Sequence, residues 1–176
     1  VFDSSFNRLD EHLQIIFRRL SVFRGGFDLP AARAIAGADL RTLIALVDKS
    51  LLTREPHTGR YELHELLRQY AGERMEAAGE QESILAAYTD YYVSFVCQRE
   101  RQLISPSQTK ALNEIQTDFD NIRHAFSRAI KRRGVDSAWP AFSGLYAFCD
   151  MRSRFYEGEA IFRLASEYLA PQTDKP

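Results

Sequence analysis

The hydrophobic residues near the start of the chain recur with the period of a helix. They fall at i, i+4, i+7, i+8 and i+11, which predicts an amphipathic helix with one buried stripe. The residues of this stripe are Leu9, Leu13, Ile16, Phe17 and Leu20. We expect the helix to end before Gly25 and Gly26, because paired glycines allow a left-handed turn.

Two further helices are predicted before residue 50. Pro30 suits the first turn of a short helix, and Gly37 is placed to close that helix. Asp39 has the position and the chemistry of an N-cap for a third helix. The apolar positions of that third helix are Leu40, Leu43, Ile44 and Val47.

Strand-like spacing replaces helix spacing after residue 50. Residues 51–55 and 60–63 flank a four-residue turn that contains Gly59, which predicts a β-hairpin. From His64 onward the apolar residues return to helix spacing, and Gly79 supplies the stop signal. Three helices, a hairpin and a fourth helix is the order of elements in a winged helix.

The chain beyond this winged-helix domain, which we place at residues 1–79, shows only helical periodicity. Residues 80–176 are therefore predicted to form a helical domain. The segments 105–107 and 118–121 are candidate breaks between its helices.

The last two helical segments fit the 34-residue helix-turn-helix template of tetratricopeptide (TPR) repeats. In that template we expect Gly158 of the second helix to face Tyr146 of the first. The predicted fold class is therefore mainly α: a winged-helix domain with one β-hairpin, followed by an α-helical hairpin or TPR-like array.

Composition adds little to this picture. The formal net charge is −1, and no apolar run approaches the roughly 18 residues of a membrane helix. Cys97 and Cys149 are isolated and lack CxxC spacing, so a reducing cytoplasm is the expected location. Because the chain begins at Val1 without a signal peptide, we interpret it as a piece of a longer cytoplasmic protein.

The charge distribution bears on nucleic acid as a partner. Residues 1–79 contain eleven Lys/Arg and eleven Asp/Glu, so their formal charge is zero. The third helix has two cations, Arg41 and Lys49, which Asp39 and Asp48 match. Since phosphate neutralisation supplies most non-specific affinity for DNA, we do not expect this chain to bind nucleic acid.

His64 is the candidate functional residue. It stands where strand spacing changes to helix spacing, close to free backbone N–H groups and the positive end of a helix dipole. An anionic ligand suits that position. On composition alone, the favoured interpretation is a partly buried histidine that caps the junction.

Other chemical motifs are incomplete. In the segment His64-Glu65-Leu66-Leu67-Arg68, an arginine replaces the second histidine of an HExxH zinc site, so no metal ligand is assigned. We interpret Asp118 and Asp120 as helix caps or part of a solvated helix face. No phosphate-binding glycine loop occurs and no serine or cysteine has the context of a nucleophile, so no catalytic residue is assigned and the chain is not expected to be an enzyme.

Three segments together resemble a known family. They are residues 20–27 (LSVFRGGF), 43–52 (LIALVDKSLL) and 60–71 (RYELHELLRQYA). They are similar to the winged-helix segment that follows the nucleotide-binding core in STAND (NB-ARC-type) signal-transduction ATPases, whose bacterial members are often transcriptional regulators. Residues 118–130 and 154–169 resemble the helical, tetratricopeptide-type region that follows in those proteins.

The resemblance implies a role for His64. Leu63-His64-Glu65 matches the Met-His-Asp motif of the family, whose histidine contacts the β-phosphate of ADP in the closed, inactive state. His64 would then be the one cofactor-binding residue, for ADP or ATP held by the full-length parent, since the fragment itself has no cofactor.

The function expected from the resemblance is regulatory and non-catalytic. The winged helix would contact an intramolecular nucleotide-binding core, and the helical part would be a sensor or would bind an unknown ligand or protein, away from any membrane. Two alternatives stay open: a DNA-binding winged-helix transcription factor, and a passive helical scaffold for protein interaction.

Overall fold

The computed structural model describes residues 6–134, 136 and 138–169, and its contacts divide the chain into two compact units. The first unit is residues 1–91 and the second is residues 92–176. The point of division lies within the long helix α6 (Gln81–Glu100), and the domain boundary expected at Gly79 stays a prediction. Among the described residues, none of the helices is long and apolar enough to cross a lipid bilayer.

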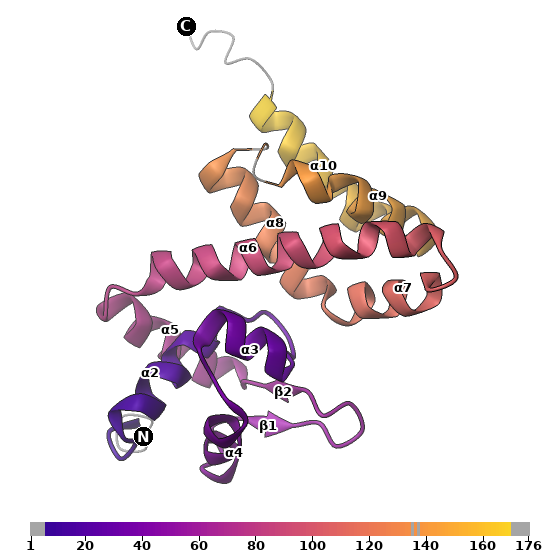
Figure 1. Cartoon of the computed structure of the whole chain (residues 1–176). Coiled ribbons are helices and arrows are strands. Elements are labelled where there is room, and N and C mark those ends of the chain that lie inside the picture. The colour runs from indigo at the N-terminus through magenta and orange to yellow at the C-terminus, as the bar shows by residue number, and fades with distance from the viewer. Residues whose placement is uncertain (1–5, 135, 137, 170–176) are drawn as a thin grey trace, which may run out of the picture. The chain divides into compact units, whose positions relative to one another are not determined.

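The first unit has the order of a winged helix, as the sequence predicts (Figure 1). Up to the start of α6, its elements after residue 10 are α2 (Glu11–Arg19), the 3-10 turn η1 (Leu20–Val22), α3 (Leu29–Ala36), α4 (Leu40–Asp48), β1 (Thr53–Arg54), β2 (Tyr61–Glu62) and α5 (Glu65–Ala77). The observed strands are shorter than the predicted ones, because only two residues of each make ladder pairs.

Aspartates begin the first three of these helices. The carboxylates of Asp10, Asp28 and Asp39 accept the backbone N–H groups of Leu13, Ala31 and Thr42 at 2.8, 2.9 and 2.7 Å. Each satisfies a donor that the first turn leaves unpaired, and each places a negative charge at the positive end of a helix. Gly37 closes α3 with φ of 77°. The predicted cap at Asp39 and the predicted end at Gly37 are confirmed.

Phe27, which lies far from the hairpin in the sequence, adds one isolated β-bridge to it. Thr53 pairs with Glu62 and Arg54 with Tyr61 in antiparallel register. Phe27 then forms a bridge with Tyr61, in which each residue donates its backbone N–H to the carbonyl of the other, at 2.9 and 2.8 Å. The bridge ties the connection between α2 and α3 to the hairpin.

The core of the first unit is built from the predicted stripe and a row of aromatic rings. All five stripe residues are buried, and Leu20 has no exposed surface. Phe23 stacks on Phe27 with ring centroids 4.2 Å apart, and Tyr88 of α6 meets the edge of Phe23 at 5.8 Å. Burial of these rings is the main source of stability in this unit.

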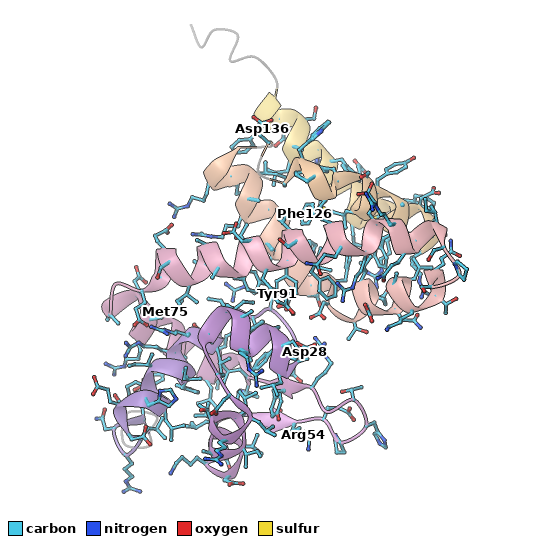
Figure 2. The ribbon with its side chains drawn as sticks, viewed as in Figure 1. Asp28, Arg54, Met75, Tyr91, Phe126 and Asp136 are labelled. Atoms are coloured by element: carbon cyan, nitrogen blue, oxygen red, sulfur yellow. The ribbon has the colours of Figure 1, made fainter. Side chains whose placement is uncertain are left out.

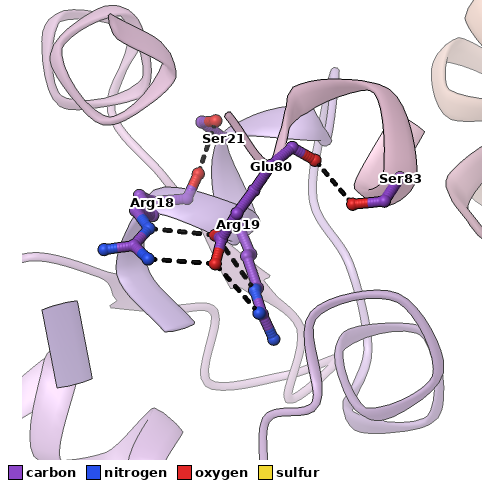
Figure 3. Close-up of polar contacts among 5 residues, drawn as sticks. All are labelled: Arg18, Arg19, Ser21, Glu80 and Ser83. Carbon is purple, nitrogen blue, oxygen red and sulfur yellow. Dashed lines mark hydrogen bonds and ion pairs between the residues drawn. The ribbon is translucent and has the colours of Figure 1, made fainter. Parts of the chain in front are cut away.

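One carboxylate joins the end of α2 to the start of α6 (Figure 3). Glu80 accepts two hydrogen bonds from Arg18, both at 3.0 Å, and two from Arg19, at 3.3 and 3.1 Å. The backbone carbonyl of Glu80 accepts a further bond from Ser83 Oγ at 2.8 Å. The two guanidinium groups, above all that of Arg18, lower the pKa of Glu80 to about 2.

This arrangement predicts that stability depends on pH through Glu80. Because the pKa is lower in the folded state than in the unfolded chain, the stabilisation is present above about pH 4.5 and is lost as the pH falls towards 2. The Glu80 side chain keeps 22% of its surface exposed, so solvent screening limits the contribution to about 1–2 kcal/mol. Glu80→Gln should therefore lower the free energy of unfolding by that amount at pH 7, measured by urea denaturation.

The matched control for this prediction is Glu73→Gln, which removes an exposed carboxylate of α5. The difference between Glu80→Gln and the unchanged protein should shrink between pH 5 and pH 2. A difference that stayed constant over this range would contradict the assigned role of Glu80.

The second unit is entirely helical over its described residues. After α6 it contains η2 (Arg101–Ile104), α7 (Gln108–Thr117), α8 (Phe119–Arg133), η4 (Trp139–Ala141), α9 (Phe142–Met151) and α10 (Phe155–Leu169). The breaks lie at the predicted places, residues 105–107 and Asp118. The predicted fold class, mainly α with a winged helix and then a helical array, is confirmed.

Asp118 has a buried side chain at the break between α7 and α8. Only 7% of its surface is exposed, and its carboxylate accepts hydrogen bonds from Tyr92 Oη and Asn121 Nδ2, both at 3.3 Å. Asp118 is the N-cap residue of α8, so the predicted cap position is confirmed, but its side chain makes no capping hydrogen bond. The side chain is not solvated, because a tyrosine from α6 reaches the break between α7 and α8. Asp120 is exposed, as predicted, beside Arg123.

Gly158 packs against Cys149 and not against Tyr146, the residue predicted to face it. A Cβ at this position would lie 3.2 Å from Cys149 Cβ and 3.3 Å from Cys149 Sγ, so α10 packs closely on Cys149 rather than on Tyr146. Burial raises the pKa of the Cys149 thiol to about 11, which keeps it protonated. Tyr146 is 62% exposed, so the expected pairing of Tyr146 with Gly158 is wrong.

Candidate functional site

Helix α4 presents one buried face and one exposed face. Thr42, Leu43 and Leu46 point into the first unit, and both leucines have no exposed surface. The opposite face contains Leu40 and Ile44, which are 48% and 47% exposed. In winged helices this third helix is the one that can enter the major groove of DNA.

The start of α4 is held by two hydrogen bonds within its first turn. One oxygen of Asp39 accepts both the backbone N–H of Thr42, at 2.7 Å, and the Thr42 hydroxyl, at 2.6 Å. The bond from the Thr42 hydroxyl is the largest cause that lowers the pKa of Asp39. The negative charge of Asp39 is thus engaged in capping, and α4 begins with a defined geometry at Leu40.

The hairpin that follows α4 has an ordered tip. The carboxylate of Glu55 accepts the backbone N–H groups of His57, at 3.0 Å, and of Thr58. A side-chain hydrogen bond with Thr58, and then these backbone bonds, lower the pKa of Glu55. Gly59 has φ of 70°, a conformation that favours glycine, and the chain then returns into β2.

Exposed cations lie on α4, directly after it, and on the hairpin. They are Arg41, Lys49 and Arg54, the last of which is labelled on the hairpin in Figure 2. Among the other described cations of the unit, Arg18 and Arg19 pair with Glu80 and Arg68 pairs with Glu65, whereas Arg8 and Arg33 are exposed on other elements. Arg41, Lys49 and Arg54 lie on or next to the third helix and the hairpin, so they define the candidate surface together with Leu40 and Ile44. We call it the α4–hairpin surface.

His64 lies at the junction of β2 and α5, where the sequence places it. It is exposed, and its Nδ1 accepts the backbone N–H of Leu66 at 3.3 Å, so it is the N-cap of α5. An acceptor at Nδ1 implies that a neutral ring has its proton on Nε2. Glu65 pairs with Arg68, the residue that replaces the second histidine of a zinc motif. Contact between His64 and a nucleotide stays a prediction.

The second unit has an aromatic hollow that sequence reasoning missed. It has a volume of about 510 Å³ and is lined by Trp139, Phe142, Ser143, Tyr146, Phe162, Ala165 and Ser166. These residues come from η4, α9 and α10, and helical periodicity within one element could not show that they converge. The high frequency of aromatic residues after position 138 was the available signal in the sequence.

Comparison with known proteins identifies the first unit. A family model described as a winged helix-turn-helix domain matches residues 9–76. Two relatives are each 35% identical to this chain over 169 residues. They are "Putative HTH-type transcriptional regulator Rv0890c" of Mycobacterium tuberculosis and "Putative HTH-type transcriptional regulator Mb0914c" of Mycobacterium bovis. The alignment covers 91% of this chain and 19% of either relative.

A further relative matches a shorter stretch. "Uncharacterized protein Rv0894" of Mycobacterium tuberculosis is 39% identical over 83 residues, which is 42% of this chain and 21% of that protein. No solved structure matches the chain. The chain thus spans about a fifth of the length of the curated relatives that it matches.

These findings overturn one expectation. We did not expect the chain to bind nucleic acid, and that prediction is wrong, because a winged helix-turn-helix domain with relatives named as transcriptional regulators points to nucleic-acid binding. The net charge led to the wrong prediction about nucleic acid because it counts every carboxylate as a full, unbalanced negative charge. Asp10, Asp28 and Asp39 cap helices, so partial charges of the backbone already balance them.

The finer expectation of a STAND-type parent is not decided by the comparisons and stays a prediction, as do the tetratricopeptide character of the array and the absence of catalysis. The architecture of the first unit and the matched residues agree with each other. Residues 9–76 form a winged helix-turn-helix domain, and the chain is homologous to a segment of proteins named as putative HTH-type transcriptional regulators.

Proposed function

We propose that this chain is a segment of a transcriptional regulator and that its winged helix contacts duplex DNA through the α4–hairpin surface. The observation that carries the proposal is the exposed face of α4 in a domain matched as a winged helix-turn-helix. The relatives named as HTH-type transcriptional regulators support it. A role in transcription agrees with the expected cytoplasmic location.

The dimensions of α4 suit the major groove. Nine residues at about 1.5 Å per residue give a helix of about 14 Å, and the groove is about 12 Å wide. Leu40 and Ile44 lie in the first half of the helix, where recognition helices meet the edges of bases. Arg54 on the hairpin is available for a phosphate beside the groove.

The three cations of this surface predict that the chain binds DNA with low affinity and that this affinity depends only modestly on salt. With Arg41, Lys49 and Arg54 as phosphate contacts, the slope of log Kobs against log salt should be about −2.7, since each contact contributes about −0.9. A single domain with three contacts has little non-specific affinity, so a full-length regulator would need more than one DNA-binding domain or copy on the same duplex. The helical array, which we propose to be non-catalytic and TPR-like, would act as the sensor or partner-binding part.

The proposal is tested by titrating the 176-residue chain into a fluorescently labelled duplex of random sequence at 50 mM salt. Fluorescence anisotropy should rise and saturate, and it should fall again on addition of unlabelled duplex. An anisotropy that did not change up to millimolar protein would refute DNA binding by this segment.

A second candidate function rests on the exposure of His64. Its ring stands in solvent at the start of the 13-residue helix α5, with Nε2 as the donor of a neutral imidazole. Such a donor can bind a phosphate oxygen that a neighbouring nucleotide-binding core presents. The winged helix would then also hold ADP in the inactive state of the parent, which fits a nucleotide-switched regulator.

His64→Ala tests this second candidate in the full-length parent. The variant should release bound ADP faster and should raise basal output, because the parent would lose one charge-assisted contact of the closed state. Arg68→Ala on the same helix is the matched control. If nucleotide-exchange assays gave the same ADP dissociation rate for the parent and for His64→Ala, His64 would have only a capping role.

A further inference from the structure

Two large apolar side chains are exposed side by side on α4. Leu40 and Ile44 are one helical turn apart, so they share a face, with Cβ atoms about 6 Å from each other. They are about half exposed, whereas Leu43 and Leu46 of the same helix are fully buried. The core therefore does not need Leu40 and Ile44, and a surface that bound only phosphates would gain nothing from them.

The remaining exposed positions of α4 offer few polar contacts to bases. Arg41 lies in the first turn, Ala45 is apolar, and Asp48 lies at the far end. The helix has no exposed asparagine, glutamine or serine that could pair with adenine or with several bases. Hydrogen bonds from α4 to base edges are thus limited to its two ends.

On this basis we propose that Leu40 and Ile44 read the C5-methyl groups of thymines in the major groove, so that the preferred DNA contains thymine at the centre of each contact. The inference rests on the proposed DNA-binding function. The C5-methyl of thymine is the apolar group that an unmodified duplex presents in this groove, and it matches an apolar side chain. Arg41 on α4, Lys49 directly after it and Arg54 on the hairpin are exposed cations that suit phosphates of the same duplex.

The geometry of the helix also predicts the spacing of these thymines. Four residues at 1.5 Å separate Leu40 and Ile44 by about 6 Å along the axis. Neighbouring base pairs are about 3.4 Å apart along the duplex axis, and the twist of the duplex moves their methyl groups farther apart than this rise. The expected core of the site is therefore two thymines within about three successive base pairs.

The experiment begins with selection of duplexes from a random library by the immobilised 176-residue chain. The thymines of the selected core are then replaced by deoxyuridine, which keeps every hydrogen-bonding group and removes only the methyl. Removal of each methyl should weaken binding about fourfold, and removal of both about fifteenfold, from the transfer energy of a buried methyl. Fluorescence anisotropy measures the dissociation constant of the thymine duplex and that of each deoxyuridine duplex.

Substitutions then assign the effect to the two side chains. Ile44→Ala should reduce the ratio between the thymine and deoxyuridine duplexes about fourfold, and this exposed position should tolerate the change. Leu66→Ala, an equally exposed leucine on α5, should leave the ratio unchanged. Equal affinity of the unchanged protein for both duplexes would overturn the inference alone, and binding to no duplex would refute the proposed function as well.

A change in oligomeric state caused by Ile44→Ala would indicate another role for Leu40 and Ile44. If Ile44→Ala converted a dimer into a monomer in sedimentation experiments and left the deoxyuridine ratio unchanged, the pair would serve contact between copies of the chain. That result would also overturn thymine recognition.

Discussion

Phe27→Ala should destabilise the winged helix by about 3–5 kcal/mol, which is a large part of the stability of a small domain. Phe27 has no exposed surface and stacks on Phe23, and its ring centroid lies 6.2 Å from that of Tyr61. Alanine would keep the backbone bridge to Tyr61 and leave a cavity beside the rings of Phe23 and Tyr61. Native-state amide exchange in α2 and α5 reports the free energy of opening for this unit.

Leu66→Ala is the control for this prediction, because Leu66 is 55% exposed and its truncation should change stability by less than about 0.5 kcal/mol. Trp139, the single tryptophan of the chain, lies in the second unit, so its fluorescence reports unfolding there. A loss below about 1 kcal/mol for Phe27→Ala would show that the aromatic row is not the centre of this core.

The double variant Arg41→Ala/Arg54→Ala should lower DNA affinity about 60-fold at 0.1 M salt. Each phosphate contact contributes about 0.9 units to the slope of log Kobs, and the release of counterions into 0.1 M salt makes that about eightfold per contact. Both side chains are exposed, and neither is in the core, so stability should hardly change. Anisotropy titrations on one selected duplex give the two dissociation constants.

Arg68→Ala controls for the loss of one positive charge, because Arg68 lies on α5, outside the α4–hairpin surface, and pairs with Glu65 of the same helix. Its affinity for DNA should stay within about twofold of the unchanged protein. If the double variant also stayed within about threefold, DNA would contact some other surface than α4 and the hairpin.

Much of the fold follows from local chemistry that is legible in the sequence. The stripe from Leu9 to Leu20, the cap at Asp39 and the left-handed Gly37 each depend on residues within one helical turn or one helix face. Their effects do not depend on where the rest of the chain goes. Such features were predicted and are confirmed.

The features that were missed depend on contacts between distant residues. The bridge from Phe27 to Tyr61 involves a single residue of a third strand, so no alternation could show it. Asp118 is buried because Tyr92 reaches it, and Gly158 meets Cys149 because of the way in which α9 and α10 pack. These contacts depend on the angles between helices, which the hydrophobic pattern does not contain.

In the candidate site, too, local features could be predicted and long-range contacts could not. The positions of α4, the hairpin and His64 could be predicted, because they depend on local order. Nucleic acid was wrongly dismissed, because a sum of charges ignores which carboxylates are engaged in caps and pairs. The cations of the candidate surface, Arg41, Lys49 and Arg54, are exposed and lie on or next to the third helix and the hairpin.

DNA binding through α4 and the hairpin should be visible in how affinity changes with salt. For the unchanged chain, log Kobs against log salt between 50 and 200 mM should fall with a slope of about −2.7, and for Arg41→Ala/Arg54→Ala with a slope of about −0.9. A slope near zero for the unchanged chain, or one slope shared by both proteins, would contradict DNA binding through α4 and the hairpin.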